Sequence, residues 1–375
     1  MKLTKICMLA TLLVCGSITI HAQEAAEQFT VATLNVDGLP QKILVLKLNP
    51  DGPGDEGTAR IGKYLQRKGY DLVMMQEDFS FHGVLSVWLE DDYKMDEWSG
   101  TIGLENNQID FLHLQNHRFA CDGLMGCWKN DLQVTVAART PWKNNFGKFS
   151  HANDEIITKG FRRYDVTLRS GDRIVVYNLH MDATLDEDEA EQKAEKDREA
   201  RIAQLEQLKE DVLQNLDSRP VIITGDMNCL YGRDNVKQVF IDAINETGRG
   251  NASDVWVELQ QKGVYPTAPS TETTSNGETL DKIIYINPTM GTQIKPVACS
   301  IDKEGYLYDG KPLGDHWPLA ATFQILSRAT AIQTIHNDNS SESRWYNLKG
   351  QRVNEPQHGI FIEQKGEMSD KRIRR

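Results

Sequence analysis

The feature that most constrains this chain is a series of short, apolar and β-branched segments separated by polar connections. Runs of this length and composition predict buried strands. The segments are Phe29–Leu34, Leu72–Met75, Ile174–Leu179, Val221–Thr224, Lys282–Ile286 and Leu319–Phe323. A chain of 375 residues that is 39% hydrophobic is long enough for one large domain built around these strands, with room for small appendages.

One segment has the spacing of a helix instead. Apolar residues recur at intervals of three and four positions at Ile202, Leu205, Leu208 and Val212, and Arg219-Pro220 ends the pattern before the next strand. The acidic stretch Asp186–Glu199 leads into this helix, and we interpret it as a solvated face or loop. The sequence therefore predicts one clear helix between two of the buried strands.

Polar residues occur at one end of each predicted strand. Asn35, Glu77, His180, Asp226 and Asn228 follow their strands, whereas Asp281, Asp315 and His316 precede theirs. A single residue of this kind usually caps a strand or forms a turn. When six strands each present one, the side chains can converge on one rim of a sheet, where functional sites are commonly built. The sequence therefore predicts one polar site.

The residue types of this set favour one kind of chemistry. Glu77, with one or more of Asn35, Asp37 and Asp315, offers hard oxygen ligands that suit Mg²⁺, with Mn²⁺ as the alternative, rather than zinc. The sequence contains no HExxH, no zinc-type Cys/His cluster, no phosphate-binding P-loop and no GxSxG elbow. His180 and His316 titrate near neutral pH and can exchange protons there. A metal, two imidazoles and Asp/Asn groups suit attack of water on a phosphoester.

The first 22 residues predict export. Lys2 and Lys5 precede an apolar run that is shorter than a membrane span, and Ala22 offers a small residue for cleavage. The alternative is a lipoprotein signal with Cys15 as the acylated residue, although Val14 suits that reading poorly. We expect a periplasmic, outer-surface or secreted protein.

Charge and cysteine usage add two constraints. Cleavage at residue 22 removes two lysines and no acid, which moves the net charge from -12 to -14. An acidic protein repels polyanions, so the composition disfavours tight nucleic-acid binding without excluding a nuclease that holds phosphate through a metal. In an oxidising compartment Cys121 and Cys127 form a short disulfide loop, or all four remaining cysteines are free and partly buried; the sequence leaves both open.

Taken together in their order along the chain, these motifs resemble the endonuclease/exonuclease/phosphatase superfamily, which includes deoxyribonuclease I. The motifs are LNVDGLP at 34–40, MMQE at 74–77, NLHMDA at 178–183, TGDMN at 224–228, TLDKIIY at 279–285 and GDHWPLA at 314–320. The resemblance covers roughly residues 29 to 325. It implies an α/β fold of DNase I type: a four-layer α/β sandwich, in which two packed mixed β-sheets are flanked by helices.

The resemblance also implies a role for each site residue. Asn35 and Glu77 are expected at the metal, with Asp37 as an extra ligand and Asp315 reaching toward it. Asp226 and Asn228 are expected to position water and phosphate. His316 is expected to be the catalytic imidazole and Asp281 its orienting partner, while His180 is a second imidazole that binds phosphate or acts as an acid.

Within the superfamily, the chain looks most similar to the bacterial neutral sphingomyelinase-type phosphodiesterases. Pro40, the histidine of NLHMDA and the segment ITKGF at 157–161 carry this likeness, and ITKGF nominates Lys159 as a phosphate contact. The sequence lacks an obvious long aromatic hairpin near Asp281 for entering a membrane. Trp128, Trp142, Phe146 and Phe149 are alternatives for that task, but we interpret two or more of them as core residues.

We therefore expect a signal peptide at 1–22, a catalytic domain at 27–326, a linker at 327–343 and a small tail at 344–375. The tail carries eight Lys or Arg against four acids, and WYNLKGQRV with GIFI resembles the C-terminal sorting segment of exported bacterial proteins. The alternative for the tail is a disordered basic extension.

The function expected from this sequence is an exported, Mg²⁺-dependent phosphodiesterase of sphingomyelinase C type. Its partner would be a lipid head group at a membrane surface, and nucleic acid is less favoured. The alternatives are a secreted nuclease like deoxyribonuclease I and a catalytically dead binding protein.

Overall fold

The computed structural model contains all six strands that the sequence predicts. It describes residues 27–43, 46–47, 49–100, 114–115, 118–119, 121–147, 154–184, 191–267, 274, 279–326, 344–348, 351–354, 359–365 and 368–374. The predicted signal segment with Cys15 and the predicted linker at 327–343 lie outside the described residues.

The first large sheet has six strands in the order β15-β18-β1-β4-β8-β5. These are β15 (Gln293–Ile301), β18 (Leu319–Leu326), β1 (Gln28–Asn35), β4 (Leu72–Gln76), β8 (Met125–Lys129) and β5 (Tyr93–Met95). Strand β1 is parallel to β4 and antiparallel to β18, so the sheet is mixed.

The second large sheet also has six strands, in the order β13-β14-β12-β11-β10-β9. These are β13 (Gly250–Asp254), β14 (Asp281–Pro288), β12 (Val221–Asp226), β11 (Arg173–His180), β10 (Gly160–Thr167) and β9 (Gln133–Pro141). Strand β12 is parallel to β11 and antiparallel to β14. The two sheets therefore have matching central pairs of parallel strands.

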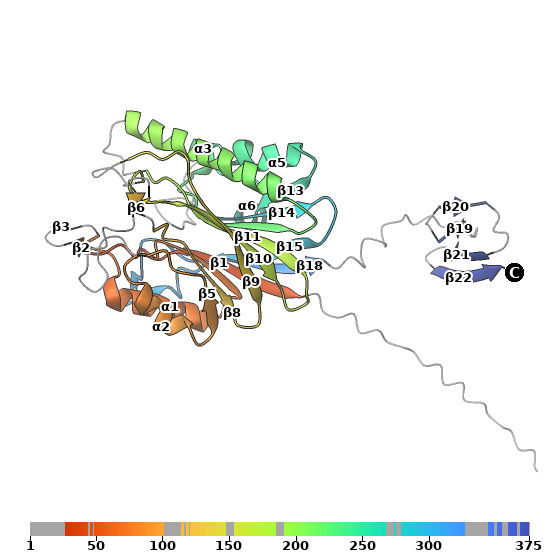
Figure 1. Cartoon of the computed structure of the whole chain (residues 1–375), viewed down its shortest axis with the longest axis horizontal. Helices are drawn as coiled ribbons and strands as arrows, with labels where there is room; N and C mark the ends of the chain where they lie inside the picture. Colours follow the sequence, from red (N-terminus) through yellow and green to blue (C-terminus); the bar gives the residue numbers. More distant parts are fainter. Residues whose placement is uncertain are drawn as a thin grey trace, which may run out of the picture.

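Helices lie on the outer side of each sheet (Figure 1). Helices α1 (Gly54–Lys68) and α2 (His82–Leu89) lie beside the first sheet, and α3 (Glu191–Asn215) covers the second. Shorter helical segments are α4 (Tyr231–Asp234), the π-helix η1 (Lys237–Asp242), α5 (Ala243–Glu246) and α6 (Val255–Gln260). The arrangement of two mixed sheets flanked by helices confirms the predicted fold class.

Helix α3 is the helix predicted from apolar spacing. Leu205, Leu208 and Val212 are fully buried against the second sheet, while Ile202 is only partly buried. The described part of the acidic stretch belongs to this helix, and its Asp197 is completely buried. The sequence alone suggested that this stretch is solvated, and the burial of Asp197 shows that this interpretation does not hold throughout.

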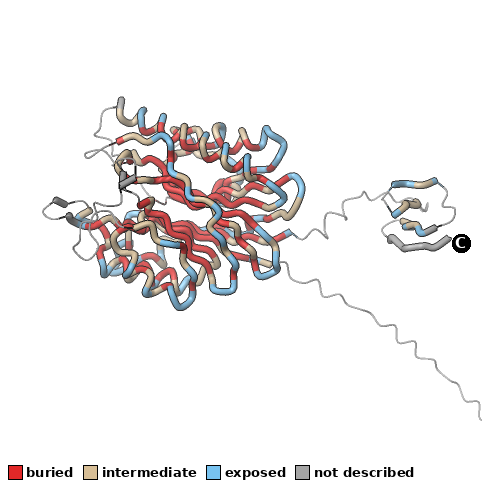
Figure 2. The backbone as a smooth tube through the Cα atoms, viewed as in Figure 1, coloured by how far each residue is buried: buried red, intermediate tan, exposed pale blue. Residues whose placement is uncertain are grey.

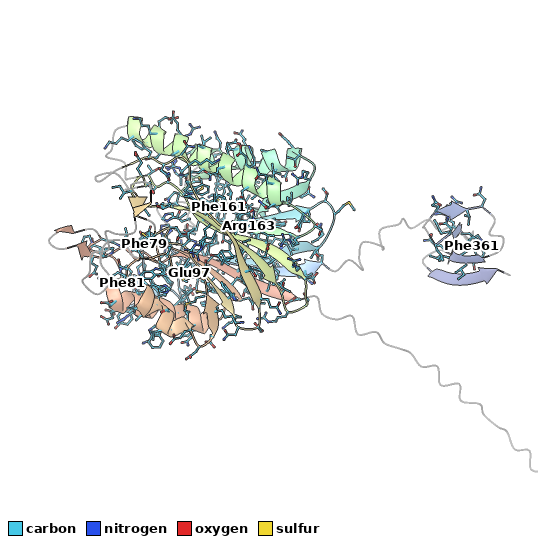
Figure 3. All side chains as sticks on the ribbon, in the orientation of Figure 1. Phe79, Phe81, Glu97, Phe161, Arg163 and Phe361 are labelled. Carbon is cyan, nitrogen blue, oxygen red and sulfur yellow. The ribbon has the colours of Figure 1, made fainter. Side chains whose placement is uncertain are left out.

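The main core lies between the two sheets, where the strands are buried along most of their length (Figure 2). Trp128 belongs to this central cluster. Trp142 and the labelled Phe161 belong to a second cluster beneath α3 (Figure 3). The interpretation of two of the four aromatic residues at 127–159 as core residues is confirmed. Phe146 is half-buried, and Phe149 lies outside the described residues.

The four cysteines at 121, 127, 229 and 299 are buried free thiols. Cys121 packs in a small cluster beside Phe79, whereas Cys127 points into the core of the first sheet. The alternative of four free thiols therefore holds over a Cys121–Cys127 disulfide, because the side chains of these two cysteines pack in different clusters. Burial raises the pKa of Cys121 to about 12, so this thiol is protonated.

Among the described residues, three short two-stranded pairings and one small sheet lie outside the large sheets. They are β2 (Lys42–Ile43) with β3 (Leu46–Lys47), β6 (Leu114–Gln115) with β7 (Arg118–Phe119), β16 (Leu307–Tyr308) with β17 (Lys311–Pro312), and a four-stranded sheet of β20 (Arg352–Val353), β19 (Arg344–Tyr346), β21 (Gly359–Lys365) and β22 (Met368–Arg374). The last sheet lies in the tail, whose sorting role stays a prediction. Among the described residues, no helix combines the length and apolar character that crossing a membrane requires.

A buried amide pair joins the two large sheets. Gln76 Nε2 of β4 donates to Asn178 Oδ1 of β11 at 2.7 Å. Asn178 Nδ2 in turn donates to the carbonyl oxygens of Met75 at 2.9 Å and Met125 at 3.2 Å. Both amide side chains are completely buried, so these bonds set the offset of one sheet against the other in a medium where unmade bonds are costly.

We predict that Asn178→Ala lowers the free energy of unfolding by about 2–4 kcal/mol, because it removes one acceptor of the buried Gln76 amide and the side-chain donor to the carbonyls of Met75 and Met125. Urea denaturation of the purified protein measures this change. The control is Asn251→Ala, whose side chain is exposed and should shift stability by less than about 0.5 kcal/mol. Equal stability of the two variants would contradict the proposed link between the sheets.

Candidate active site

The predicted polar residues meet at one edge of the sandwich because of strand direction. Parallel strands β1 and β4 both end there, as do β11 and β12, whereas the antiparallel strands β14 and β18 begin there. Asp226 is paired with His180 on one side and with Asp281 on the other. Hydrogen bonds between strands therefore hold three of the predicted residues side by side.

Asn35 connects the two sheets at this edge. Its Nδ2 donates to Glu77 Oε1 at 2.8 Å within the first sheet and lies 3.2 Å from Asp226 Oδ2 of the second. Its Oδ1 accepts the backbone N–H of Asp37 at 3.0 Å. The asparagine is buried and its hydrogen-bonding groups are engaged, so its orientation is fixed.

Three site residues have a backbone conformation that non-glycine residues rarely adopt. The φ angle is +52° at Asp37, +57° at Glu77 and +49° at Asn228. Each follows the end of a strand and turns its side chain toward the rim. Strained backbone of this kind clusters at functional sites, where the surrounding structure over-determines it.

Asp226, Asp281 and His316 form a compact group. His316 Nδ1 donates to Asp281 Oδ2 at 2.7 Å, and His316 Nε2 lies 3.6 Å from Asp226 Oδ2. One ligand-type atom from each residue lies within 4.8 Å of the others. Thr274 supports this group, because its Oγ1 accepts the N–H of Asp281 at 3.1 Å and its carbonyl accepts the N–H of Trp317 at 2.8 Å.

The charges in this group stabilise one another. Burial alone would lower the pKa of His316, but the carboxylates of Asp281, Asp226 and Asp315 hold it well above the usual value. Burial likewise opposes ionisation of Asp226, yet the charge of His316 and the backbone N–H of Asn228 hold the pKa of this carboxyl below its usual range. The arrangement therefore places an imidazolium between two buried carboxyl groups.

His180 differs from His316 although both were expected to titrate near neutral pH. Complete burial, followed by the charge of Lys159, lowers the pKa of His180 well below its usual value, so the imidazole is neutral. Its Nε2 lies 3.5 Å from Asp226 Oδ2 and 3.9 Å from Glu77 Oε1. Its Nδ1 has no hydrogen-bond partner among the described residues.

A second group consists of carboxylates that repel one another. Burial and the charges of Asp315 and Glu77 raise the pKa of Asp37 to about 8. Burial and the charge of Asp315 raise the pKa of Glu77 to about 7. Asn49 donates from its side chain to Asp37 and partly offsets this repulsion. Carboxyl groups whose pKa values are raised in this way favour a bound cation, because a positive charge between them removes the repulsion.

The two other predicted phosphate contacts lie next to each other. Lys159 is buried, pairs with Asp154 at 2.5 Å and donates to the carbonyl of Met181 at 3.3 Å. Asn228 donates from Nδ2 to the same carbonyl at 3.1 Å, while its backbone N–H donates to Asp226 Oδ1 at 2.9 Å. All predicted site residues are therefore in this region, although Lys159 is an internal cation rather than an exposed one.

Four supporting residues were not identified by the sequence analysis. Thr274, Asn49 and the Gln76–Asn178 pair do not contribute charges or imidazoles, so the pattern of chemically active residues does not include them. Gln76 stands directly before Glu77, and Asn178 opens the NLHMDA motif. The positions of Gln76 and Asn178 inside two of the family motifs were the one sequence feature that could have identified them.

Curated relatives of the chain carry a common name. A sphingomyelinase from Mycobacterium bovis is 26% identical over 308 residues, and sphingomyelinases from Mycobacterium tuberculosis match equally. The match covers 81% of this chain and 54% of the relative. The chain thus spans about half the length of the curated relatives it matches.

Solved structures share the fold at low identity. D. rerio TDP2 in complex with a single-strand DNA product has a TM-score of 0.51 at 16% identity, over 79% of this chain and 99% of that one. An endonuclease/exonuclease/phosphatase from Bacteroides vulgatus has a TM-score of 0.50 at 15% identity, over 80% of this chain and 100% of that one. These likenesses confirm the DNase I-like sandwich.

Membership of the family rests on the extent of the match and on its position. The family model described as Endonuclease/Exonuclease/phosphatase family matches residues 32–289, which is more than half of the chain and includes the end of β1 and the whole of β4, β11, β12 and β14. The motifs at the ends of these strands supply the rim residues other than Asp315 and His316, which follow the matched segment. The chain belongs to the Endonuclease/Exonuclease/phosphatase family.

Proposed function

We propose that this protein is an exported, Mg²⁺-dependent phosphoester hydrolase that cleaves a phospholipid head group, as a phosphodiesterase of sphingomyelinase C type. One observation carries the proposal. A group of mutually repelling carboxylates lies at the same rim as a hydrogen-bonded Asp281–His316 pair and the ionised Asp226. Family membership and the relatives named sphingomyelinase support it.

The donor set fits a hard divalent cation. Glu77, Asn35, Asp37 and Asp315 would hold Mg²⁺, or Mn²⁺ as an alternative, through oxygen atoms. When bound, such an ion neutralises phosphate charge and polarises the phosphoryl group. Without a cation, burial and mutual repulsion disfavour the ionised form of Asp37 and Glu77. A bound cation would remove this penalty.

The remaining residues supply orientation and proton transfer. Asp226 is ionised and accepts a hydrogen bond from water, which directs the water at phosphorus. The Nε2–H of His316 is directed toward the phosphate side, because Nδ1 is fixed by Asp281. His316 thereby stabilises charge that develops in the transition state, while His180 and Asn228 hold the phosphate and the buried Lys159 adds positive charge to the site.

Two features favour a lipid head group over nucleic acid. After removal of the signal segment the net charge is -14, which disfavours approach of a polyanion. The hairpin β16–β17 directly precedes Asp315 and His316 in the chain, and its Leu307 and Tyr308 are 41% and 57% exposed. Exposed apolar side chains on the segment that leads into the site suit a substrate presented by a membrane surface.

Export is part of the proposal and rests on the sequence. The segment at 1–22 has the charge and apolar length of a signal peptide, and the tail at 344–375 has the pattern of a sorting segment. The protein would then meet its lipid substrate in the periplasm, at the outer surface or outside the cell.

The first prediction concerns the metal. Excess chelator should abolish hydrolysis, and Mg²⁺ or Mn²⁺ should restore it. Glu77→Gln should weaken metal binding by at least about tenfold, since even the loss of a residue that only hydrogen-bonds to a metal ligand commonly costs that much. Calorimetric titration measures the affinity, with Glu90→Gln, an exposed residue, as the matched control. Full turnover in excess chelator would rule out this metal site.

The second prediction concerns roles. His316→Ala and Asp226→Asn should each lower kcat by roughly 10²–10⁴, the usual effect of losing one positioned acid–base group. The factor by which the double variant lowers kcat should be much smaller than the product of the two single factors, because the groups act as a unit. Asp172→Asn, at the other end of β11, is the control. Wild-type turnover in either site variant with native stability would remove that residue from the mechanism.

The third prediction concerns substrate. Values of kcat/KM should be higher on sphingomyelin dispersions than on duplex or single-stranded DNA at moderate salt. Steady-state assays with Mg²⁺ on all three substrates make the comparison. Efficient DNA cleavage with inert sphingomyelin, ceramide-phosphoinositol and phosphatidylcholine would favour the nuclease alternative, and inactivity on every phosphoester would favour a dead scaffold.

A further inference from the structure

Tyr306 carries a polar atom that none of the roles above uses. The side chain is completely buried, and its hydroxyl has no hydrogen-bond partner among the described residues. Buried hydroxyl groups in folded proteins are almost always paired, so an unpaired one requires an explanation. One explanation is a partner that arrives with a ligand.

Aromatic packing fixes where this hydroxyl lies. The ring of Tyr306 packs edge-on against Tyr64 of α1 at 5.0 Å between centroids and against Trp317 at 6.3 Å. The backbone N–H of Leu313 donates to the carbonyl of Tyr306 at 3.3 Å, which closes the hairpin β16–β17 at its base. The ring therefore has little freedom to turn its hydroxyl elsewhere.

The hydroxyl lies next to the repelling carboxylates. A Cβ atom placed on Gly314 would lie 3.3 Å from the Tyr306 hydroxyl oxygen and 3.7 Å from Asp37 Cβ, so both side chains border the space beside this glycine. Burial raises the pKa of Tyr306 well above its usual value, and the charges of Asp315 and Asp37 add to the shift. A protonated phenol whose pKa responds to both carboxylates is an unused hydrogen-bond donor in their vicinity.

We propose that Tyr306 is a positioning residue of the metal site, whose hydroxyl donates a hydrogen bond to the Asp37–Asp315 pair when these carboxylates hold a divalent cation. The inference rests on the proposed metal dependence and extends it to a residue outside the ligand set. Hydrogen bonds to ligating carboxylates fix their orientation, and their loss commonly weakens metal affinity by 10–100-fold. Gly314 leaves the space that this contact needs.

The alternative is that Tyr306 is only a core residue, and the two roles predict different results for Tyr306→Phe. Loss of an unpaired buried hydroxyl should leave the stability of the metal-free protein unchanged or higher in both cases. Only a positioning residue should also change metal affinity. We expect the Kd for Mn²⁺, measured by calorimetric titration of the full chain, to rise about tenfold.

Tyr64→Phe is the matched control. Its hydroxyl donates to Asp302 Oδ2 at 2.8 Å on the far side of the same aromatic cluster, so this variant should lose stability and keep its Mn²⁺ affinity. Gly314→Ala provides an independent test, because its methyl group would crowd the Tyr306 hydroxyl and should also raise the Kd for Mn²⁺.

The outcomes separate this inference from the proposed function. If the wild-type protein binds Mn²⁺ and both Tyr306→Phe and Gly314→Ala bind it with the same Kd, the role of Tyr306 is refuted while the metal site stands. If the wild-type protein binds neither Mn²⁺ nor Mg²⁺, both proposals are refuted. A raised Kd in Tyr306→Phe, with unchanged stability of the metal-free protein, supports the inference.

Discussion

The buried contact between Gln76 and Asn178 is the interaction on which the site depends. Gln76 stands one residue before Glu77, and Asn178 stands two residues before His180, so the amide pair fixes where each sheet presents its reactive residues. The bond from Asn35 to Asp226 then spans the same gap at the rim. Because a displaced buried amide would lose several hydrogen bonds at once, the two halves of the site keep one relative position.

This fixed geometry places two different electrostatic environments at one edge. Around Asp37 and Glu77, burial combines with like charges, and both pKa values are raised. Around His316, opposite charges alternate, and the imidazolium is stabilised despite its burial. A cation is favoured in the first environment and proton exchange with water in the second. The juxtaposition suits a phosphoester, which requires charge neutralisation and an oriented nucleophile at the same atom.

Several elements were not predicted, and the reason is their polar content. Strand β9 alternates exposed and half-buried residues at the edge of its sheet, and it lacks an apolar run. Strand β10 contains Arg162, which is fully buried because it forms ion pairs with Asp96 and Asp122. Helix α1 has few large apolar residues and still buries Tyr64 and Leu65. The local sequence pattern assigns such segments to the surface. The residues that pair with or cover their polar side chains are distant in the sequence, so a local pattern does not reveal them.

What the sequence by itself determined is the six strands that carry the site, their order along the chain and the reactive residues at their ends, since short apolar runs and flanking polar residues are local properties. Only the tertiary structure decided how those residues behave. It made His180 neutral and His316 charged, left the cysteines as free thiols, and placed the hydroxyl of Tyr306 beside Asp37. Burial and neighbouring charges decide such properties, and both arise from residues that meet only when the two sheets pack.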